Sequence, residues 1–143
     1  MQPRITLITL GVDDLHRALL FYRDGLGFPT TWNGDRGVVF FQTNGTTLAL
    51  YPYDKLAEDA GEQFTRQKRP KFHGIVLAHN VRTKPEVAQV LAQAQRAGGK
   101  IEKPAQDASW GGHSGYFSDP DGYLWEVAYG AFPIRDDGSL EIP

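Results

Sequence analysis

Apolar and polar residues alternate in the first stretch of the chain, and the alternation then gives way to a helical spacing. Residues 4–12 are rich in β-branched side chains and repeat with a period of two, which predicts a strand. Asp13 or Asp14 can cap the helix that follows. One apolar stripe then recurs at helical spacing, formed by Leu15, Leu19, Tyr22 and Leu26. We expect Gly25 and Gly27 to end this helix.

Three more strands are predicted after the helix, at residues 28–32, 37–43 and 46–52. The pairs Asn33-Gly34 and Asn44-Gly45 are strong hairpin signals. These elements make a first module over residues 4–53. Residues 54–70 are polar and charged, and they are predicted to form a linker with a short helical segment around Lys55 to Phe64.

A second module is predicted over residues 71–130. Thr83 and Glu86 form a capping box with Pro85 in the first turn, which predicts the start of a helix. The buried stripe of this helix consists of Val87, Val90, Leu91 and Ala94. A longer loop, residues 104–113, follows, and the tail at residues 131–143 is expected to lie loosely on the surface.

The two modules are imperfect copies of one unit. Corresponding landmarks keep their order with a slowly growing offset: Leu10 to Leu77 is 67 residues, Gly27 to Gly99 is 72, and Gly45 to Gly122 is 77. Each copy is a strand, a helix and three more strands, so the pattern predicts an α+β chain of two βαβββ modules packed side by side. A site is expected where the copies meet.

Composition narrows the possible function classes. The 143 residues carry 15 Lys+Arg and 17 Asp+Glu, a net charge of −2 without a basic stripe, which argues against nucleic acid and anionic membranes as partners. The absence of cysteine excludes disulfides, thiolate metal sites and a Cys nucleophile. The chain has no signal-peptide pattern and no apolar run near the about 18 residues of a membrane span, so we expect a cytoplasmic protein.

Two segments carry a resemblance to a known family. Residues 12–28 read V-D-D-L-H-R-A-L-L-F-Y-R-D-G-L-G-F and residues 115–127 read G-Y-F-S-D-P-D-G-Y-L-W-E-V. Together they resemble the vicinal oxygen chelate superfamily, which includes glyoxalase I, extradiol dioxygenases, and fosfomycin- and bleomycin-resistance proteins. The resemblance implies that the eight strands form an open, cup-shaped barrel with a ligand in the cup, and that the protein is a homodimer.

In the metal-dependent members of this family, four side chains at fixed strand positions hold a divalent ion. The motif and the internal repeat place these positions at Leu7, Ala49, Gly74 and Glu126. Only Glu126 can ligate, whereas a protein site normally supplies three or more ligands. We therefore predict no metal and no other cofactor. The alternative is a metal-dependent lyase, dioxygenase or thiol transferase whose site has shifted to His73, Glu126 and His113.

Several residues remain as candidates to line the cup. Glu126 lies on an apolar strand, so it needs a hydrogen-bonding partner or water, and it could act as a general base, as a ligand anchor, or be a remnant of the metal site. Tyr51 and Tyr116 are candidate lining aromatics. Trp110, flanked by Gly111 and Gly112, suits either a lid or a hydrophobic plug, and His113 is expected near the rim. Trp125 is expected to face the helices. The first hypothesis is a metal-independent small-molecule-binding protein.

Overall fold

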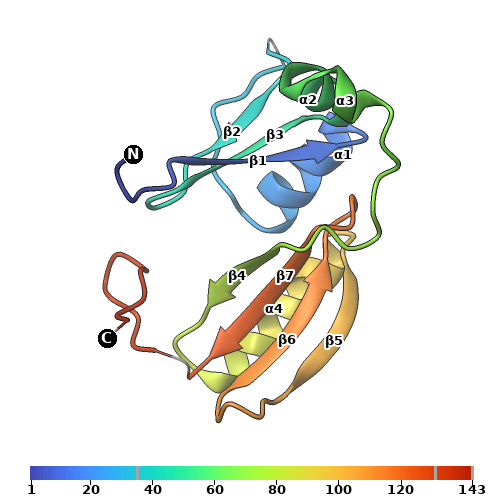
Figure 1. Ribbon diagram of the computed structural model, residues 1–143. Helices are drawn as coiled ribbons and strands as arrows, with labels where there is room; N and C mark the ends of the chain where they lie inside the picture. Colours follow the sequence, from blue (N-terminus) through green and yellow to red (C-terminus); the bar gives the residue numbers. More distant parts are fainter. Residues whose placement is uncertain (35, 131, 143) are drawn as a thin grey trace. The chain divides into compact units, whose positions relative to one another are not determined.

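The computed structural model describes residues 1–34, 36–130 and 132–142. These residues form two compact units, Met1–Pro70 and Lys71–Pro143, and each is drawn with its labels in Figure 1. Both units combine a small sheet with helices, so the α+β class is confirmed. Among the described residues no helix has both the length and the apolar character needed to cross a membrane.

The first unit is built on a three-stranded sheet. Its elements in chain order are β1 (Leu7–Val12), α1 (Leu15–Leu19), the π-helical segment η1 (Leu20–Gly25), β2 (Val39–Phe41), β3 (Thr47–Pro52), α2 (Tyr53–Ala60) and α3 (Glu62–Thr65). β3 is the central strand, parallel to β1 and antiparallel to β2. The helical segment expected between the modules is therefore present as α2 and α3, and α2 packs against β1 and β3.

The first helix begins as the sequence predicts, but it does not keep one helical period. The Asp14 side chain accepts a hydrogen bond from the backbone N–H of Arg17 at 2.9 Å, which is an N-cap. The helix widens in η1, where the N–H of Leu26 donates to the carbonyl of Phe21 at 2.9 Å. This extra residue per turn lets both Phe21 and Tyr22 point inward, and both are buried. The turn ends at Gly27, whose φ of 81° needs a residue without Cβ.

One strand predicted in the first module is absent. Residues 28–32 run beside β2 but form no regular ladder with it. Pro29 accepts a hydrogen bond from the N–H of Gln42 at 2.8 Å but has no N–H to donate. The side chain of Thr30 instead donates to the carbonyl of Phe40 at 2.7 Å, in the place of a backbone donor. The described residues therefore contain seven strands rather than the expected eight, and β2 is shorter than the predicted 37–43.

The core of the first unit lies between its sheet and the first helix. Leu10, Val12, Leu48 and Leu50 share one face of the sheet and are buried. The ring of Tyr22 packs on Phe41 and Phe28, with centroid distances of 5.7 and 5.8 Å. Burial of this many large side chains is what stabilises so small a unit.

The second unit is a four-stranded sheet with one long helix along one face (Figure 1). Its elements are β4 (Val76–Asn80), α4 (Lys84–Arg96), β5 (Lys100–Asp107), β6 (His113–Ser118) and β7 (Leu124–Tyr129). The strand order is β4-β7-β6-β5, and β4 is parallel to β7 while the other pairs are antiparallel. In both units the first strand thus lies parallel to the last, as expected for two copies of one topology.

The helix of the second unit is well defined by the sequence. The predicted capping box is present, since the Glu86 carboxylate accepts from the N–H groups of Arg82 and Thr83 at 2.9 Å each. Val87, Leu91 and Ala94 are buried against the sheet. Trp125 is only 8% exposed and stacks on Phe117 with centroids 6.0 Å apart, so its predicted place in the core is confirmed.

Two predictions for the second unit are wrong. The loop expected at residues 104–113 is shorter, because β5 continues to Asp107 through register shifts between Ile101 and Lys103 and between Lys103 and Gln106. The tail is also not loose where it is described. It turns back on itself with a bridge between Ile134 and Leu140. The Arg82 guanidinium donates to the carbonyls of Ile134 and Arg135 at 2.9 and 2.7 Å.

Candidate functional site

The second sheet has two distinct faces, and strand register assigns each residue to one of them. Gly115 faces α4, because a Cβ built on it would lie 2.5 Å from the Leu91 side chain. Its partner Val127 is fully buried on the same side. The alternate positions form the opposite side, which we call the helix-free face. It comprises Val76, Ala78, Asn80, Ser114, Tyr116, Ser118, Leu124, Glu126 and Ala128.

At the centre of the helix-free face Tyr116 lies directly across from Glu126. The Glu126 carboxylate is close enough to influence the ionisation of the Tyr116 phenol, which can donate a hydrogen bond to it. Burial raises the pKa of the Tyr116 phenol, and the hydrogen bond to Glu126 and the negative charge of that carboxylate raise it further. The phenol is therefore a neutral donor at physiological pH, and the half-buried Glu126 has a partner within the protein.

Charged side chains of β5 also reach this face. The Ser118 hydroxyl donates to Glu102 Oε1 at 2.7 Å, and Lys100 Nζ lies 3.0 Å from Glu102 Oε2. Both contacts lower the pKa of Glu102, and the hydrogen bond from Ser118 has the larger effect. The Lys103 ammonium lies over the Tyr116 ring, 5.7 Å from its centroid. Neighbouring residues of a regular strand point to opposite faces, so the register shift after Ile101 is what brings both Glu102 and Lys103 to one face.

Sequence reasoning missed Glu102 and Lys103 as site residues. Nothing in the pattern of Lys100–Asp107 marks a bulge, and a strict alternation would separate the two side chains. The one available signal was the density of charge on a strand expected to be half buried. Polar residues on both faces of such a strand indicate an interrupted ladder.

Three other residues were predicted for the site, and each is described within its own unit. Tyr51 belongs to the first unit, where it lies on β3 opposite Gly11 of β1 and is half-buried. Trp110 is 49% exposed, and its ring packs on Gly112, where an added Cβ would overlap it. This contact within the turn fits the plug that the sequence allowed for Trp110.

His113 lies on the α4 side of the sheet. It pairs with Tyr129 on β7, in the same set of positions as Gly115 and Val127. Its Nδ1 is 2.7 Å from Asp107 Oδ1. The expectation that His113 and Glu126 share one site is wrong, since the sheet separates the two side chains.

The chain does not supply the donor set that the family metal requires. Leu7 and Ala49 have no ligating atom, and Gly74 has no side chain. His73 stacks on Tyr123, with ring centroids 4.7 Å apart. Tyr123 precedes Glu126 by three residues, which is about 10 Å along an extended strand. Within residues 1–34, 36–130 and 132–142, no three His, Asp or Glu side chains converge as metal ligands do. The shifted metal site built on His73, Glu126 and His113 therefore does not fit.

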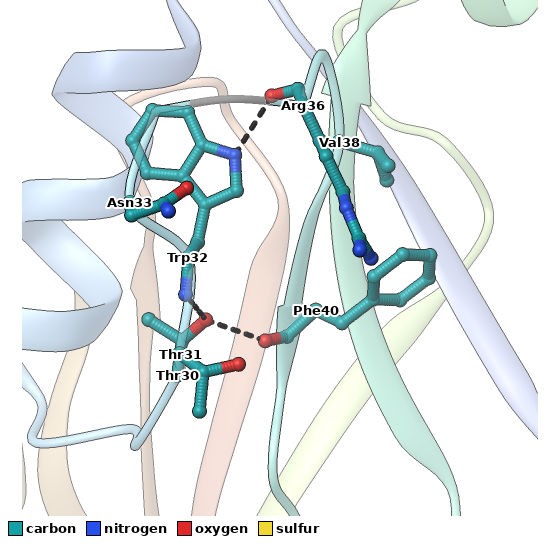
Figure 2. Close-up of a pocket in the computed structure, with 7 residues that line it drawn as sticks. All are labelled: Thr30, Thr31, Trp32, Asn33, Arg36, Val38 and Phe40. Atoms are coloured by element: carbon teal, nitrogen blue, oxygen red, sulfur yellow. Dashed lines mark hydrogen bonds between the residues drawn. The ribbon is translucent and has the colours of Figure 1, made fainter.

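A separate hollow lies in the first unit, beside the segment that replaces the missing strand. Its volume is about 260 Å³, and Trp32, Arg36 and Phe40 are among its walls. Figure 2 shows the indole of Trp32 on one side and the Arg36 side chain extending toward the Phe40 ring on the other. Trp32 Nε1 donates to the Arg36 carbonyl at 2.8 Å, which fixes the indole in place. Aromatic walls and a guanidinium suit a flat, partly polar ligand.

Comparison with known proteins gives consistent results. The Glyoxalase/Bleomycin resistance protein/Dioxygenase superfamily matches residues 4–127. A crystal structure of a glyoxalase-related enzyme from Fulvimarina pelagi is 35% identical, with a TM-score of 0.85 and 98% of each chain covered. The uncharacterized protein YraH of Bacillus subtilis is 26% identical over 126 residues, covering 87% of this chain and 96% of YraH.

The fold is shared more widely than the sequence. A lactoylglutathione lyase from Agrobacterium tumefaciens is 23% identical, with a TM-score of 0.66 and coverage of 91% of this chain and 96% of the lyase. At this identity the likeness concerns the fold alone.

Proposed function

The chain belongs to the Glyoxalase/Bleomycin resistance protein/Dioxygenase superfamily, and we propose that it binds a small molecule on the helix-free face of its second sheet without the family metal. In the resemblance drawn from the sequence, this face corresponds to the wall of the ligand cup. The observation that carries the proposal is the Tyr116–Glu126 pair. Glu126 stands at one of the four positions where metal-dependent relatives place a ligand. The other three positions hold Leu7, Ala49 and Gly74, which supply no ligating side chain.

The chemistry of this face suits a ligand with a polar group and a flat apolar part. Glu126 can accept a hydrogen bond from a ligand hydroxyl or amine, and Tyr116 stays protonated and can donate one. Lys103 adds a positive charge over the Tyr116 ring. Leu124 and Val76 supply apolar surface on the same face. A few polar groups set in an apolar wall are typical of small-molecule sites.

A second candidate is metal-free proton transfer with Glu126 as the general base. The observation that favours it is the same pair, because a carboxylate beside a neutral phenol is a base beside an acid. Turnover of any bound ligand would favour the second candidate, and Glu126→Gln should then abolish it. A protein that only binds shows no turnover in either form.

The proposal is tested by fragment screening of the tag-free protein in the presence of EDTA, with NMR detection. We expect aromatic and amphipathic fragments to shift the signals of Tyr116 and its neighbours. Loss of a hydrogen bond to a charged group should weaken their binding about 10- to 100-fold in Glu126→Gln. Glu62→Gln, an exposed carboxylate of α3, is the matched control. Equal binding by Glu126→Gln and the wild type, or binding only after a divalent metal is added, would overturn the proposal.

The homodimer and the cytoplasmic location stay predictions. Sedimentation analysis of the purified chain tests the first, with a mass of twice 15.9 kDa as the expected result.

A further inference from the structure

A hollow of about 350 Å³ lies on the α4 side of the second sheet, opposite the helix-free face. Its walls include Lys84 at the start of α4, Asp107 at the end of β5, His113 on β6 and Tyr129 on β7. Gly112, in the turn before β6, closes one side. All of these residues belong to the second unit, and none takes part in the Tyr116–Glu126 pair.

A three-residue charge cluster occupies this hollow. Asp107 Oδ1 lies 2.7 Å from Lys84 Nζ and 2.7 Å from His113 Nδ1. The two nitrogens are therefore within twice that distance of one another. The contact with Lys84, followed by that with His113, holds the pKa of the Asp107 carboxyl below its ordinary value. Asp107 stays ionised and orients the imidazole through Nδ1, which turns Nε2 away from the carboxylate.

The signs of these charges indicate what the hollow can hold. A metal ion would have only the imidazole and one carboxylate as ligands, and the Lys84 ammonium beside them would repel it. An oxyanion meets favourable groups instead. Lys84 has three N–H donors and uses one of them on Asp107, and a protonated imidazole offers a second donor at Nε2.

The geometry points to a second ligand site here, in which Lys84 and His113 bind the carboxylate or other oxyanion group of a small organic acid. Asp107 is a positioning residue that holds the Lys84 ammonium and the His113 imidazole side by side. The Tyr129 ring forms the adjacent wall and can contact the apolar part of the ligand. This site is separate from the helix-free face and does not depend on the function proposed for it.

The turn that borders the hollow is closely packed. A Cβ on Gly112 would lie 2.6 Å from the Tyr129 carbonyl oxygen and 2.0 Å or less from the Trp110 ring. The turn backbone thus runs directly over β7, with Trp110 packed on it. The turn is also closed by hydrogen bonds between Ala108 N–H and the Gly112 carbonyl at 2.9 Å and between Gly111 N–H and the Ala108 carbonyl at 3.0 Å.

The test is an NMR titration of the isotope-labelled full chain with sulfate and, separately, acetate, at constant ionic strength. We expect saturable shifts of the His113 imidazole and of the Gly111 and Gly112 amides with at least one of the two anions.

Two variants make the result specific. Lys84→Gln should weaken binding by about tenfold or more, because it removes one charged donor. Lys100→Gln, which removes an equal charge from a lysine paired with Glu102 outside the hollow, should leave binding unchanged. Shifts that never saturate with either anion, or that weaken equally in both variants, would overturn the proposal and mean general screening of charge.

Discussion

Tyr116 and Glu126 lie opposite one another on the neighbouring strands β6 and β7, and the carboxylate raises the pKa of the phenol beyond the effect of burial. Glu126 stands where metal-dependent relatives are expected to place a ligand, but here its partner is a side chain of the protein. A carboxylate half-buried on an apolar strand is costly unless it is paired. The cross-strand phenol supplies such a partner.

Removing the negative charge should change the ionisation of the phenol. Burial is the largest cause of the raised pKa of Tyr116, and hydrogen bonding to Glu126 and the charge of that carboxylate add to it. In Glu126→Gln we expect this pKa to fall part of the way toward the ordinary value. A pH titration of the tyrosine ring carbons by NMR measures this.

Glu102→Gln is the control for that titration, since Glu102 lies on the same sheet but bonds Ser118 rather than Tyr116. An unchanged Tyr116 titration in Glu126→Gln would show that the cross-strand hydrogen bond does not form.

The capping box of α4 should give the fold a specific pH dependence. Hydrogen bonds from backbone N–H groups lower the pKa of the Glu86 carboxylate, and the one from Thr83 has the largest effect. A lowered folded-state pKa contributes stability at pH values above the ordinary glutamate pKa, and this contribution is lost as the pH falls through the lower value. We expect Glu86→Gln to lower the Tm by a few degrees at neutral pH, and the difference from the wild type to vanish in acid.

Thermal unfolding of both proteins across the acid range measures this effect. Glu62→Gln is a suitable reference, because the Glu62–Arg66 ion pair at 3.1 Å is more than 80% exposed on both sides and should contribute little. A Tm difference for Glu86→Gln that persists at the lowest pH would mean that the charge of Glu86 is not the cause.

Alanine substitutions at Gly111 and Gly112 test two different effects in the turn before β6. One effect is a clash of the new side chain, and the other is a backbone conformation that favours glycine. In Gly112→Ala the new Cβ would overlap the Trp110 ring, so the variant should lose about 1–3 kcal/mol and displace the indole. In Gly111→Ala nothing lies within 4 Å of the new Cβ, but the φ of 94° costs about 1–2 kcal/mol. The Trp110 indole N–H signal should move only in Gly112→Ala. Movement in both variants would show that the ring is not seated on Gly112.

Replacing Arg82 should weaken the attachment of the described part of the tail. Arg82 donates to the carbonyls of Ile134 and Arg135, and these are the contacts that hold the turn of residues 133–141 to the start of α4. In Arg82→Gln we expect the amides of Arg135 and Glu141 to exchange with solvent about tenfold faster. Arg96→Gln, at the other end of α4, is the control. Unchanged exchange in Arg82→Gln would mean that the tail turn is stable by itself.

Much of this architecture was predictable where one local signal sufficed. Asp14 at the first cap, the Thr83–Glu86 capping box and the inward stripe of Val87, Leu91 and Ala94 each follow from spacing alone. The order of elements in the two copies follows from the repeat. In these places local preference and tertiary packing agree.

The errors came where a single residue changes the register. Thr30 replaces a backbone donor with its side chain, which a strand pattern at residues 28–32 does not reveal. The bulge after Ile101 brings Glu102 and Lys103 to one face. His113 was expected in a loop, where strand alternation does not predict which way a side chain points. In the structure β6 begins at His113. His113 and Tyr116 are three positions apart on this strand, so their side chains lie on opposite faces of the sheet.

The central claim is that the family site works here without a metal, and metal retention tests it most directly. The tag-free protein is incubated in turn with Mn²⁺, Ni²⁺, Zn²⁺ and Fe²⁺, dialysed, and its metal content measured beside that of Glu126→Gln. One carboxylate at the four family positions predicts retention below about a tenth of an equivalent for every ion, with no difference between the proteins. Retention of nearly one equivalent by the wild type, lost in Glu126→Gln, would contradict the account.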